Sequence, residues 1–207
     1  MSRIIVFGDV NQNYKDLKRL LEQSSSLSID GYVCHGDIPN LPWRFDLGEM
    51  QKCVGLINQY NVRWIAGNHE QEILANAEKL GVPKSLANRI KNLPEELIIG
   101  KIVVKHSSPE GLWRIARRHS EFDCLQNNYP GQDTYIFGHS HRRCYHKKNG
   151  RKIESTPVRF NRKYPVSDGL HLINTGAIHL WPSFDLNRGY VLSDSDKQTI
   201  TFKKIEK

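Results

Sequence analysis

The sequence predicts an α/β fold in which two β-sheets pack together and helices cover them on the outside. The first observation behind this prediction is that residues 1–80 alternate three short apolar runs with three stretches of helical periodicity, the pattern of parallel βαβ units. The second is that the later half of the chain gives short strand-like runs separated by turns. Together they indicate a two-sheet sandwich.

In the first half, each predicted strand is a short apolar run that is followed by a polar loop. Apolar residues at helical spacing predict a helix after each strand, and Gly81 and Pro83 stop the third helix. In open α/β sheets, ligands bind at the carboxyl ends of the strands, so the polar residues after these strands should converge. The predicted strands are 3–7, 31–34 and 62–66, and the predicted helices are 14–23, 46–60 and 70–80.

The second half contains shorter strand-like runs. The first of them is interrupted at Gly100-Lys101, and the second ends at Gly138-His139. The last two runs flank a good hairpin turn at 193–197. No obvious linker divides the chain, so we expect one domain over residues 1–207. The predicted strands of this half are 97–105, 133–137, 170–174, 189–192 and 199–203.

Composition and length set broad limits. The 207 residues are enough to bury a core without disulfide bonds. The apolar runs are far too short to span a bilayer, and a strand that starts at Arg3 leaves no room for a signal peptide. We therefore expect a cytoplasmic protein with no membrane partner. The four cysteines include no C-x-x-C pair, so we expect reduced, mostly structural thiols.

Residues 142–163 form a strongly basic segment. They contain nine Lys and Arg residues and one acid, Glu154, so the charge of this segment alone equals the +8 of the whole chain. We interpret it as part of a basic insertion at about 142–168. Such a cluster attracts polyanions or anionic substrates, and the alternative is a solvated basic loop.

Polar side chains follow five of the predicted strands. Taken singly, a Gly-Asp pair is usually a turn or a helix cap, and a lone histidine is more often structural than a ligand. Five such loops, all at strand ends, make coincidence improbable and predict a common pocket. The candidate residues are Asp9 with Asn11, Asp37, Asn68 with His69, His106, and His139 with His141.

These loops resemble, in order and rough spacing, the motifs of the calcineurin-like metallophosphoesterase superfamily, and most closely its small uncapped bacterial and archaeal phosphodiesterases. The likeness runs from residue 3 to about 178. It implies a four-layer αββα sandwich, in which two mixed β-sheets pack together between helices. The motifs are Gly8-Asp9, Gly36-Asp37, Gly67-Asn68-His69-Glu70, His106-Ser107-Ser108-Pro109, Gly138-His139-Ser140-His141 and the late turn Asn174-Thr175-Gly176-Ala177.

The resemblance also implies a site with two divalent metal ions. Asp37 would bridge the ions, while His69 would bind no metal and would stabilise developing charge or protonate the leaving oxygen. The reaction implied is hydrolysis of a phosphate ester, with a phosphodiester favoured, by a hydroxide that bridges the metals. The first metal would be held by Asp9 and His141, and the second by Asn68, His106 and His139.

Two departures from the family pattern bear on chemistry. The family has a histidine ligand two residues after its first Asp, where this chain has Asn11. An amide oxygen is a weaker donor to transition metals, so we expect a weaker first site and manganese as the metal, with Fe, Zn, Ni or Mg as alternatives. A simple loop role for Asn11 is the other interpretation. The Asp-Arg pair of phosphoprotein phosphatases is also missing after Asp37, which argues against that activity.

Arginines and aromatic residues suggest where a substrate would bind. Arg44 follows the Asp37 loop, and Arg114 and Arg118 lie in a predicted helix at 112–119. Arg and Lys side chains neutralise phosphates, and aromatic residues beside cations can stack nucleobases. Such aromatic residues are interleaved with the basic segment, namely Tyr145, Phe160 and Tyr164.

That pattern suggests a nucleotide or nucleic-acid ester as substrate, and a solvent-facing β-hairpin is the alternative interpretation of the same segment. The function therefore has three alternatives to a general phosphodiesterase. They are a phosphomonoesterase, a nucleotide or nucleic-acid phosphodiesterase, and a weakly active binding or scaffold protein on the same fold.

Overall fold

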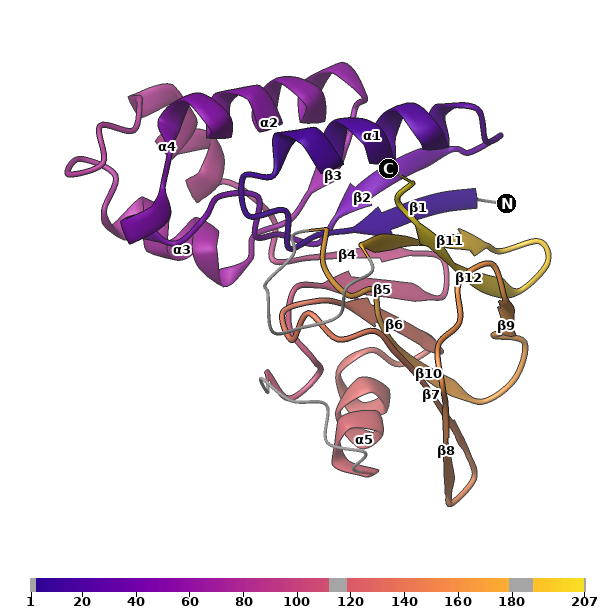
Figure 1. Ribbon diagram of the computed structural model, residues 1–207. Coiled ribbons are helices and arrows are strands. Elements are labelled where there is room, and N and C mark those ends of the chain that lie inside the picture. The colour runs from indigo at the N-terminus through magenta and orange to yellow at the C-terminus, as the bar shows by residue number, and fades with distance from the viewer. Residues whose placement is uncertain (1–2, 112–118, 179–187, 207) are drawn as a thin grey trace.

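The computed structural model describes residues 3–111, 119–178 and 188–206, and these form four layers (Figure 1). Helices α1 to α4 cover one β-sheet, a second β-sheet packs against the other face of the first, and α5 covers the outside of the second. The predicted αββα sandwich is therefore confirmed. None of the described helices combines the length and the apolar character that a membrane span requires.

The first sheet has six strands in the order β3-β2-β1-β11-β12-β9. β1, β2 and β3 run parallel, as predicted, and β11 pairs with β1 in the antiparallel direction. The predicted hairpin near the end of the chain is present as β11 and β12. The strands are β1 (Arg3–Phe7), β2 (Gly31–Cys34), β3 (Arg63–Trp64), β9 (Lys163–Pro165), β11 (Gly189–Asp194) and β12 (Thr199–Lys204).

The second sheet also has six strands, in the order β4-β5-β6-β10-β7-β8. β5 and β6 run parallel, so their carboxyl ends lie at the same edge of this sheet. The predicted strand at 97–105 is in fact the antiparallel hairpin of β4 and β5, which turns at Gly100 with a φ of 57°. The strands are β4 (Glu96–Ile99), β5 (Ile102–Lys105), β6 (Thr134–Phe137), β7 (Cys144–Asn149), β8 (Lys152–Thr156) and β10 (Leu170–Asn174).

The helices follow the predicted periodicity, and side-chain caps fix some of their starts. Asn13 accepts a hydrogen bond from the Asp16 N–H, and Asp46 accepts one from the Glu49 N–H. The third predicted helix was placed at 70–80, whereas α3 begins at Asn68. The helices are α1 (Tyr14–Ser25), the 3₁₀ turn η1 (Pro42–Arg44), α2 (Leu47–Gln59), α3 (Asn68–Ala75), α4 (Lys84–Lys91) and α5 (His119–Asn128).

Three apolar clusters hold the layers together. Alternation along β1 sends Ile5 and Phe7 to the helices α1 to α4, and Ile4 and Val6 to the second sheet. The third cluster, between the second sheet and α5, includes Phe122. Both faces of β1 are thus buried, which explains its uninterrupted apolar sequence. The predicted helix at 112–119 lies outside the described residues except for His119, the first residue of α5.

Candidate metal centre

The five loops predicted to converge do meet at one edge of the sandwich. They follow β1, β2 and β3 in the first sheet and β5 and β6 in the second. Hydrogen bonds join the two sheets here: His106 Nδ1 lies 3.0 Å from the carbonyl oxygen of His35, and the His139 N–H donates to Asp9 Oδ2 at 3.0 Å. Residues more than 100 positions apart in sequence, such as Asp9 and His139, therefore share one site.

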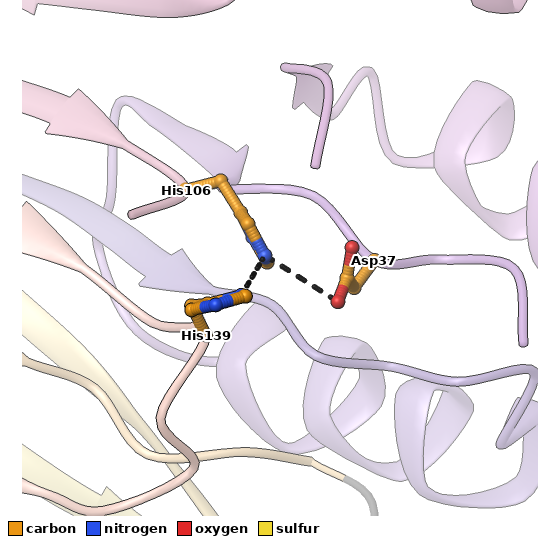
Figure 2. Close-up of side chains that lie close together, drawn as sticks. All are labelled: Asp37, His106 and His139. Atoms are coloured by element: carbon orange, nitrogen blue, oxygen red, sulfur yellow. Dashed lines mark hydrogen bonds and ion pairs between the residues drawn. The ribbon is translucent and has the colours of Figure 1, made fainter. Parts of the chain in front are cut away.

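Four side chains form the most compact cluster. His106 Nε2 lies 2.9 Å from Asn68 Oδ1, 3.1 Å from His139 Nδ1 and 3.4 Å from Asp37 Oδ2. His139 Nδ1 is also 2.9 Å from Asn68 Oδ1. Figure 2 shows Asp37, His106 and His139 pointing toward one another from three different loops, and their potential ligand atoms all lie within 4.8 Å of each other.

A second group lies beside this cluster. Asp9 Oδ1 is 3.2 Å from His141 Nε2, and the hydrogen bond from the His139 main chain to Asp9 Oδ2 connects the two groups. Asn11 is 3% exposed, and neither its side-chain oxygen nor its nitrogen has a hydrogen-bond partner. Buried amides are rarely left unpartnered, so the Asn11 side chain is open to a partner from outside the chain, such as water, a ligand or an ion.

The loops that carry these side chains adopt left-handed backbone conformations. Such conformations are uncommon outside glycine, cost of order 1–3 kcal/mol and gather at functional sites. Here they turn the chain after β1, β2 and β6, so that the side chains that follow these three strands face the same pocket. The residues and their φ angles are Asp9 (49°), Asn11 (48°), Asp37 (54°), His139 (61°) and His141 (57°).

The charges of the site compensate each other in pairs. Burial by itself lowers the pKa of His106, but the Asp37 carboxylate outweighs burial and raises this pKa to about 9. Burial raises the pKa of Asp37, and His106 more than reverses this, so the pKa lies below its usual value. The pKa of Asp9 is likewise lowered by His141, against burial, and that of His141 is raised by Asp9. Asp37 and Asp9 are therefore each paired with a histidine, and each pairing favours the charged form of both partners.

His69 lies beside Asp37 and outside the compact cluster. Its main-chain N–H donates to Asp37 Oδ1 at 2.9 Å, and its Nε2 lies 3.5 Å from Asp37 Oδ2. Its Nδ1 is 3.0 Å from the carbonyl oxygen of Pro39, which can only accept, so Nδ1 carries a proton. The ring is thus fixed with Nε2 directed toward the Asp37 carboxylate.

Glu70 organises these loops, a role that the sequence analysis did not assign. Its carboxylate accepts N–H groups from Gly67 and Ile38, both at 2.8 Å, from Asp37 at 2.9 Å and from the Trp64 indole at 3.1 Å. Burial and the Asp37 charge raise the pKa of Glu70 to about 7, and the main-chain donors oppose this rise. Glu70 is at the third helical position of α3, where a capping-box acid belongs, so its spacing from Gly67 was an available signal.

His35 is the second residue that sequence reasoning missed. Its ring is fully buried between the main chains of Gly8 and Gly138, and Nε2 lies 2.7 Å from the Thr175 hydroxyl oxygen. Burial lowers its pKa to about 4, so the ring is neutral at pH 7. No spacing rule singles out His35, since it only precedes the Gly36-Asp37 motif.

The donor set fits divalent metal ions. Two carboxylates, two amides and three histidines converge from separate loops, and the unpartnered Asn11 amide lies among them. There is also no space for extra side chains: a β-carbon on Gly67 would come 2.3 Å from Asp37 Oδ1, and one on Gly138 would come 2.3 Å from Asp9 Oδ2. Mixed nitrogen and oxygen ligands without thiolates suit Mn, Fe, Zn or Ni better than Ca.

The structure places the residues predicted to bind substrate in different environments. Arg44 ends η1 and is exposed, while Arg114 and Arg118 lie outside the described residues. In the basic segment, Tyr145 and Tyr164 are 4% and 2% exposed and pack between the sheets, so the prediction that they could stack nucleobases is wrong. The reason is strand alternation, which points these rings inward from β7 and β9.

The remaining aromatic residue of that segment, Phe160, is partly buried, with the Arg143 guanidinium 4.2 Å from the centre of its ring. The segment itself forms the β7–β8 hairpin and β9. The segment therefore contains a β-hairpin, as the alternative interpretation stated.

The two-sheet sandwich and the Asp, Asn and His cluster at its edge define the metallophosphoesterase class. The sequence model of the calcineurin-like phosphoesterase superfamily domain matches residues 2–198. The chain therefore belongs to the calcineurin-like phosphoesterase superfamily. A comparison with curated protein sequences gives no match.

Solved structures share the fold over nearly their whole length. A metallophosphoesterase from Sphaerobacter thermophilus has a TM-score of 0.78 at 22% identity, with 99% of this chain and 88% of that chain covered. A novel archaeal phosphodiesterase has a TM-score of 0.57 at 13% identity, with 98% and 99% covered. Yfce, a phosphoesterase from E. coli, has a TM-score of 0.52 at 17% identity, with 99% and 100% covered. At these identities the similarity shows the fold alone.

The interactions of Glu70 predict that Glu70→Gln destabilises the metal-free protein. Each carboxylate oxygen accepts two N–H groups, so either orientation of the new amide places its NH₂ against two buried donors. Unsatisfied buried donors cost about 1–3 kcal/mol each, and we expect the free energy of unfolding to fall by about 2–4 kcal/mol. Urea unfolding in the presence of a chelator measures this change.

The matched control is Glu72→Gln, which makes the same substitution at an exposed position of the same helix. We expect it to change the stability by less than about 0.5 kcal/mol. Equal stability of the two variants would show that the Glu70 carboxylate does not hold the loops.

Proposed function

We propose that this protein hydrolyses phosphate esters, and phosphodiesters in preference to monoesters, with two divalent cations as cofactors. The observation that carries the proposal is the convergence of Asp37, Asn68, His106 and His139 within hydrogen-bonding distance, next to the Asp9–His141 pair. Membership of the calcineurin-like phosphoesterase superfamily supports it.

The two groups of residues suggest two ion positions. Asn68, His106 and His139 would hold one ion, and Asp9, Asn11 and His141 the other, with Asp37 shared between them. Bound ions would act as Lewis acids that activate a water molecule and polarise the phosphoryl group. The protein would keep these ligands in place through Glu70, which fixes the Asp37 loop, and through Asn174, which donates to the Gly138 carbonyl oxygen in the His139 loop.

His69 would act as the general acid that protonates the leaving group. Its Nδ1–H is held by the Pro39 carbonyl oxygen, so Nε2 is the atom that exchanges a proton. Asp37 Oδ2, 3.5 Å away, would stabilise the protonated ring. An alkoxide is a poor leaving group as long as it carries its negative charge. Protonation of the departing oxygen by His69 Nε2 would remove that charge and so help the bond to phosphorus break.

Two considerations favour a phosphodiester and manganese. Ile38-Pro39-Asn40 follow Asp37, where phosphoprotein phosphatases carry their Asp-Arg pair, and one solved structure with this fold is described as an archaeal phosphodiesterase. The amide of Asn11 offers oxygen rather than imidazole nitrogen to the first ion. Oxygen ligands shift the preference toward harder ions, and Mn²⁺ accepts both oxygen and nitrogen.

Hydrolysis of bis(p-nitrophenyl) phosphate with Mn²⁺ tests this function directly. We expect turnover by the unaltered protein, slower turnover of p-nitrophenyl phosphate, and loss of activity to background in His106→Ala because a ligand is missing. His69→Ala should lose about 100-fold or more in kcat on a diester with an alkoxide leaving group, since a general acid contributes about that much.

p-Nitrophenolate leaves without protonation, so the same His69 variant should lose much less on bis(p-nitrophenyl) phosphate. Glu72→Gln serves as the unaffected control. If the unaltered protein turns over neither a diester nor a monoester with any of Mn, Mg, Fe, Zn or Ni, the protein is not a phosphoesterase.

Metal binding should release protons. His106 has its pKa raised to about 9 by Asp37, so its ring is protonated at pH 7.5 and must lose that proton to act as a ligand. The apparent affinity for Mn²⁺ should therefore rise as pH increases toward 9, by about tenfold per pH unit for each proton released. Titration calorimetry at pH 7.5 in buffers of different ionisation enthalpy counts these protons.

His106→Gln should release fewer protons than the unaltered protein, and substitution of the exposed His119 by Gln should leave the number unchanged. An apparent affinity that is independent of pH between 7 and 9 would contradict the ion pair between Asp37 and His106.

Asn11→His should strengthen the first ion position. Imidazole binds Mn²⁺, Zn²⁺ and Ni²⁺ more strongly than an amide oxygen does, so the variant should hold closer to two ions per chain at metal concentrations where the unaltered protein holds closer to one. Metal analysis after gel filtration gives this ratio. An unchanged ratio would mean that Asn11 does not contribute to an ion position.

A further inference from the structure

We propose that Trp43 is a stacking platform for a nucleobase and that the substrate is consequently a nucleotide phosphodiester. The inference rests on the proposed phosphodiesterase function and adds the chemical class of the substrate. Nothing in the site chemistry above requires Trp43, and the family motifs do not include it.

The exposure of Trp43 is unusual for its type. The side chain is 74% exposed, and Trp43 is the only Phe, Tyr or Trp among residues 3–111, 119–178 and 188–206 that is exposed. Its neighbours Ile38 and Phe45 pack into the core between the helices and the first sheet. A single exposed apolar side chain needs no explanation by itself, so the position of Trp43 is what matters.

Both ends of the Trp43 loop are attached to the candidate metal centre. On one side, the Pro39 carbonyl oxygen holds Nδ1 of His69. On the other side, the Asp46 N–H donates to Gln12 Oε1 at 3.1 Å, and Gln12 Nε2 donates back to the Asp46 carbonyl oxygen. Gln12 directly follows Asn11, so this second attachment is next to the first ion position.

This attachment limits how far Trp43 can lie from the two segment ends that contact the loops of the candidate metal centre. It is four residues from Pro39 and three from Asp46, and a chain spans at most about 3.6 Å per residue. Its Cα is therefore within about 14 Å of Pro39 and about 11 Å of Asp46. Trp43 thus lies on the short segment between the Pro39 contact to His69 and the Asp46 contact to Gln12.

The indole suits a base better than other ligands of a phosphoesterase. Every nucleobase has a flat π face, and stacking on an aromatic side chain tolerates any base. η1 holds the backbone that carries the indole in a turn, with the Arg44 N–H donating to the Leu41 carbonyl oxygen at 2.9 Å. The aromatic side chains first suggested for this purpose, Tyr145 and Tyr164, are buried.

Two chromogenic diesters with the same leaving group test the proposal. Thymidine 5′-(p-nitrophenyl phosphate) carries a base and methyl p-nitrophenyl phosphate does not, and both release p-nitrophenolate. Trp43→Ala should raise KM for the thymidine ester about tenfold, with kcat nearly unchanged, and should leave KM for the methyl ester unaltered. Trp43→Phe should restore most of the loss because it keeps an aromatic face.

Ile98→Ala is the matched control, because Ile98 is also an exposed apolar residue, at 52%, and lies on β4. It should change neither KM. An equal rise of KM for both esters in Trp43→Ala, or no rise for either, overturns the stacking role.

A failure of the proposed function looks different, since the unaltered protein then hydrolyses neither ester. In that case, the protein is titrated with thymidine 5′-monophosphate and its tryptophan fluorescence is measured, which tests for a base at Trp43 without any turnover. Quenching that is present in the unaltered protein and lost in Trp43→Phe supports a base at Trp43. Quenching that persists in Trp43→Phe, or that is absent from the unaltered protein, overturns it.

Discussion

One buried imidazole sets the distance between the two sheets at the site. The ring of His35 lies against two glycines, one after β1 and one after β6, and a β-carbon on Gly8 or on Gly138 would come within 2.2 Å or 2.0 Å of His35 Cε1. Its Nε2 is paired with the Thr175 hydroxyl group, and its carbonyl oxygen pairs with Nδ1 of His106. Loops from both sheets therefore pack on a single residue, and the ligand atoms of Asp9, Asp37 and His106 are brought to their distances by this contact.

The rest of the site is strained and polar, and the surrounding packing must offset that cost. Asp9 and Asp37 are both buried, and each raises the pKa of a neighbouring histidine in order to keep its own charge. Five of the candidate ligands adopt left-handed backbones, and the Asn11 amide has no partner within the chain. The strained backbones and the unpartnered amide do not stabilise the fold, since both oppose folding. Their concentration at one edge marks that edge as the place where function has shaped the chain.

The sequence predicted those strands and helices whose formation depends mainly on neighbouring residues. The strands β1 and β2 and the helices α1 and α2 are periodic, and their loops carry the motif residues, so both the parallel order and the convergence of the loops were predictable. β3 was predicted at 62–66, whereas the structure has only Arg63–Trp64. The Ile65 N–H still donates to the Cys34 carbonyl oxygen of β2, and the chain leaves the ladder at Ala66, whose N–H donates to the Pro94 carbonyl oxygen, a contact that depends on tertiary structure.

The roles of His35 and Glu70 could not be derived in full for a similar reason. The Glu70 carboxylate serves donors from two loops, and only the capping partner Gly67 is visible in its local spacing. The importance of His35 depends on Gly8 and Gly138 lying on either side of it, and those glycines are 130 residues apart. The inward orientation of Tyr145 was not predicted. The charged residues beside it in β7 hide the alternation of inward and outward side chains in the sequence.

The charge of the basic segment acts mainly at a distance. Lys147 pairs with Asp168 at 2.8 Å, Lys148 with Asp123 at 2.5 Å and Lys152 with Glu154 at 2.7 Å. Such exposed pairs add little stability, but they restrain the lysines and leave them less available for direct contact with phosphates. The net charge of +8 is nevertheless unchanged by pairing within the chain. A net charge of this sign attracts anions without direct contacts, so any effect of the segment on a phosphate ester would come from its overall charge rather than from these paired lysines.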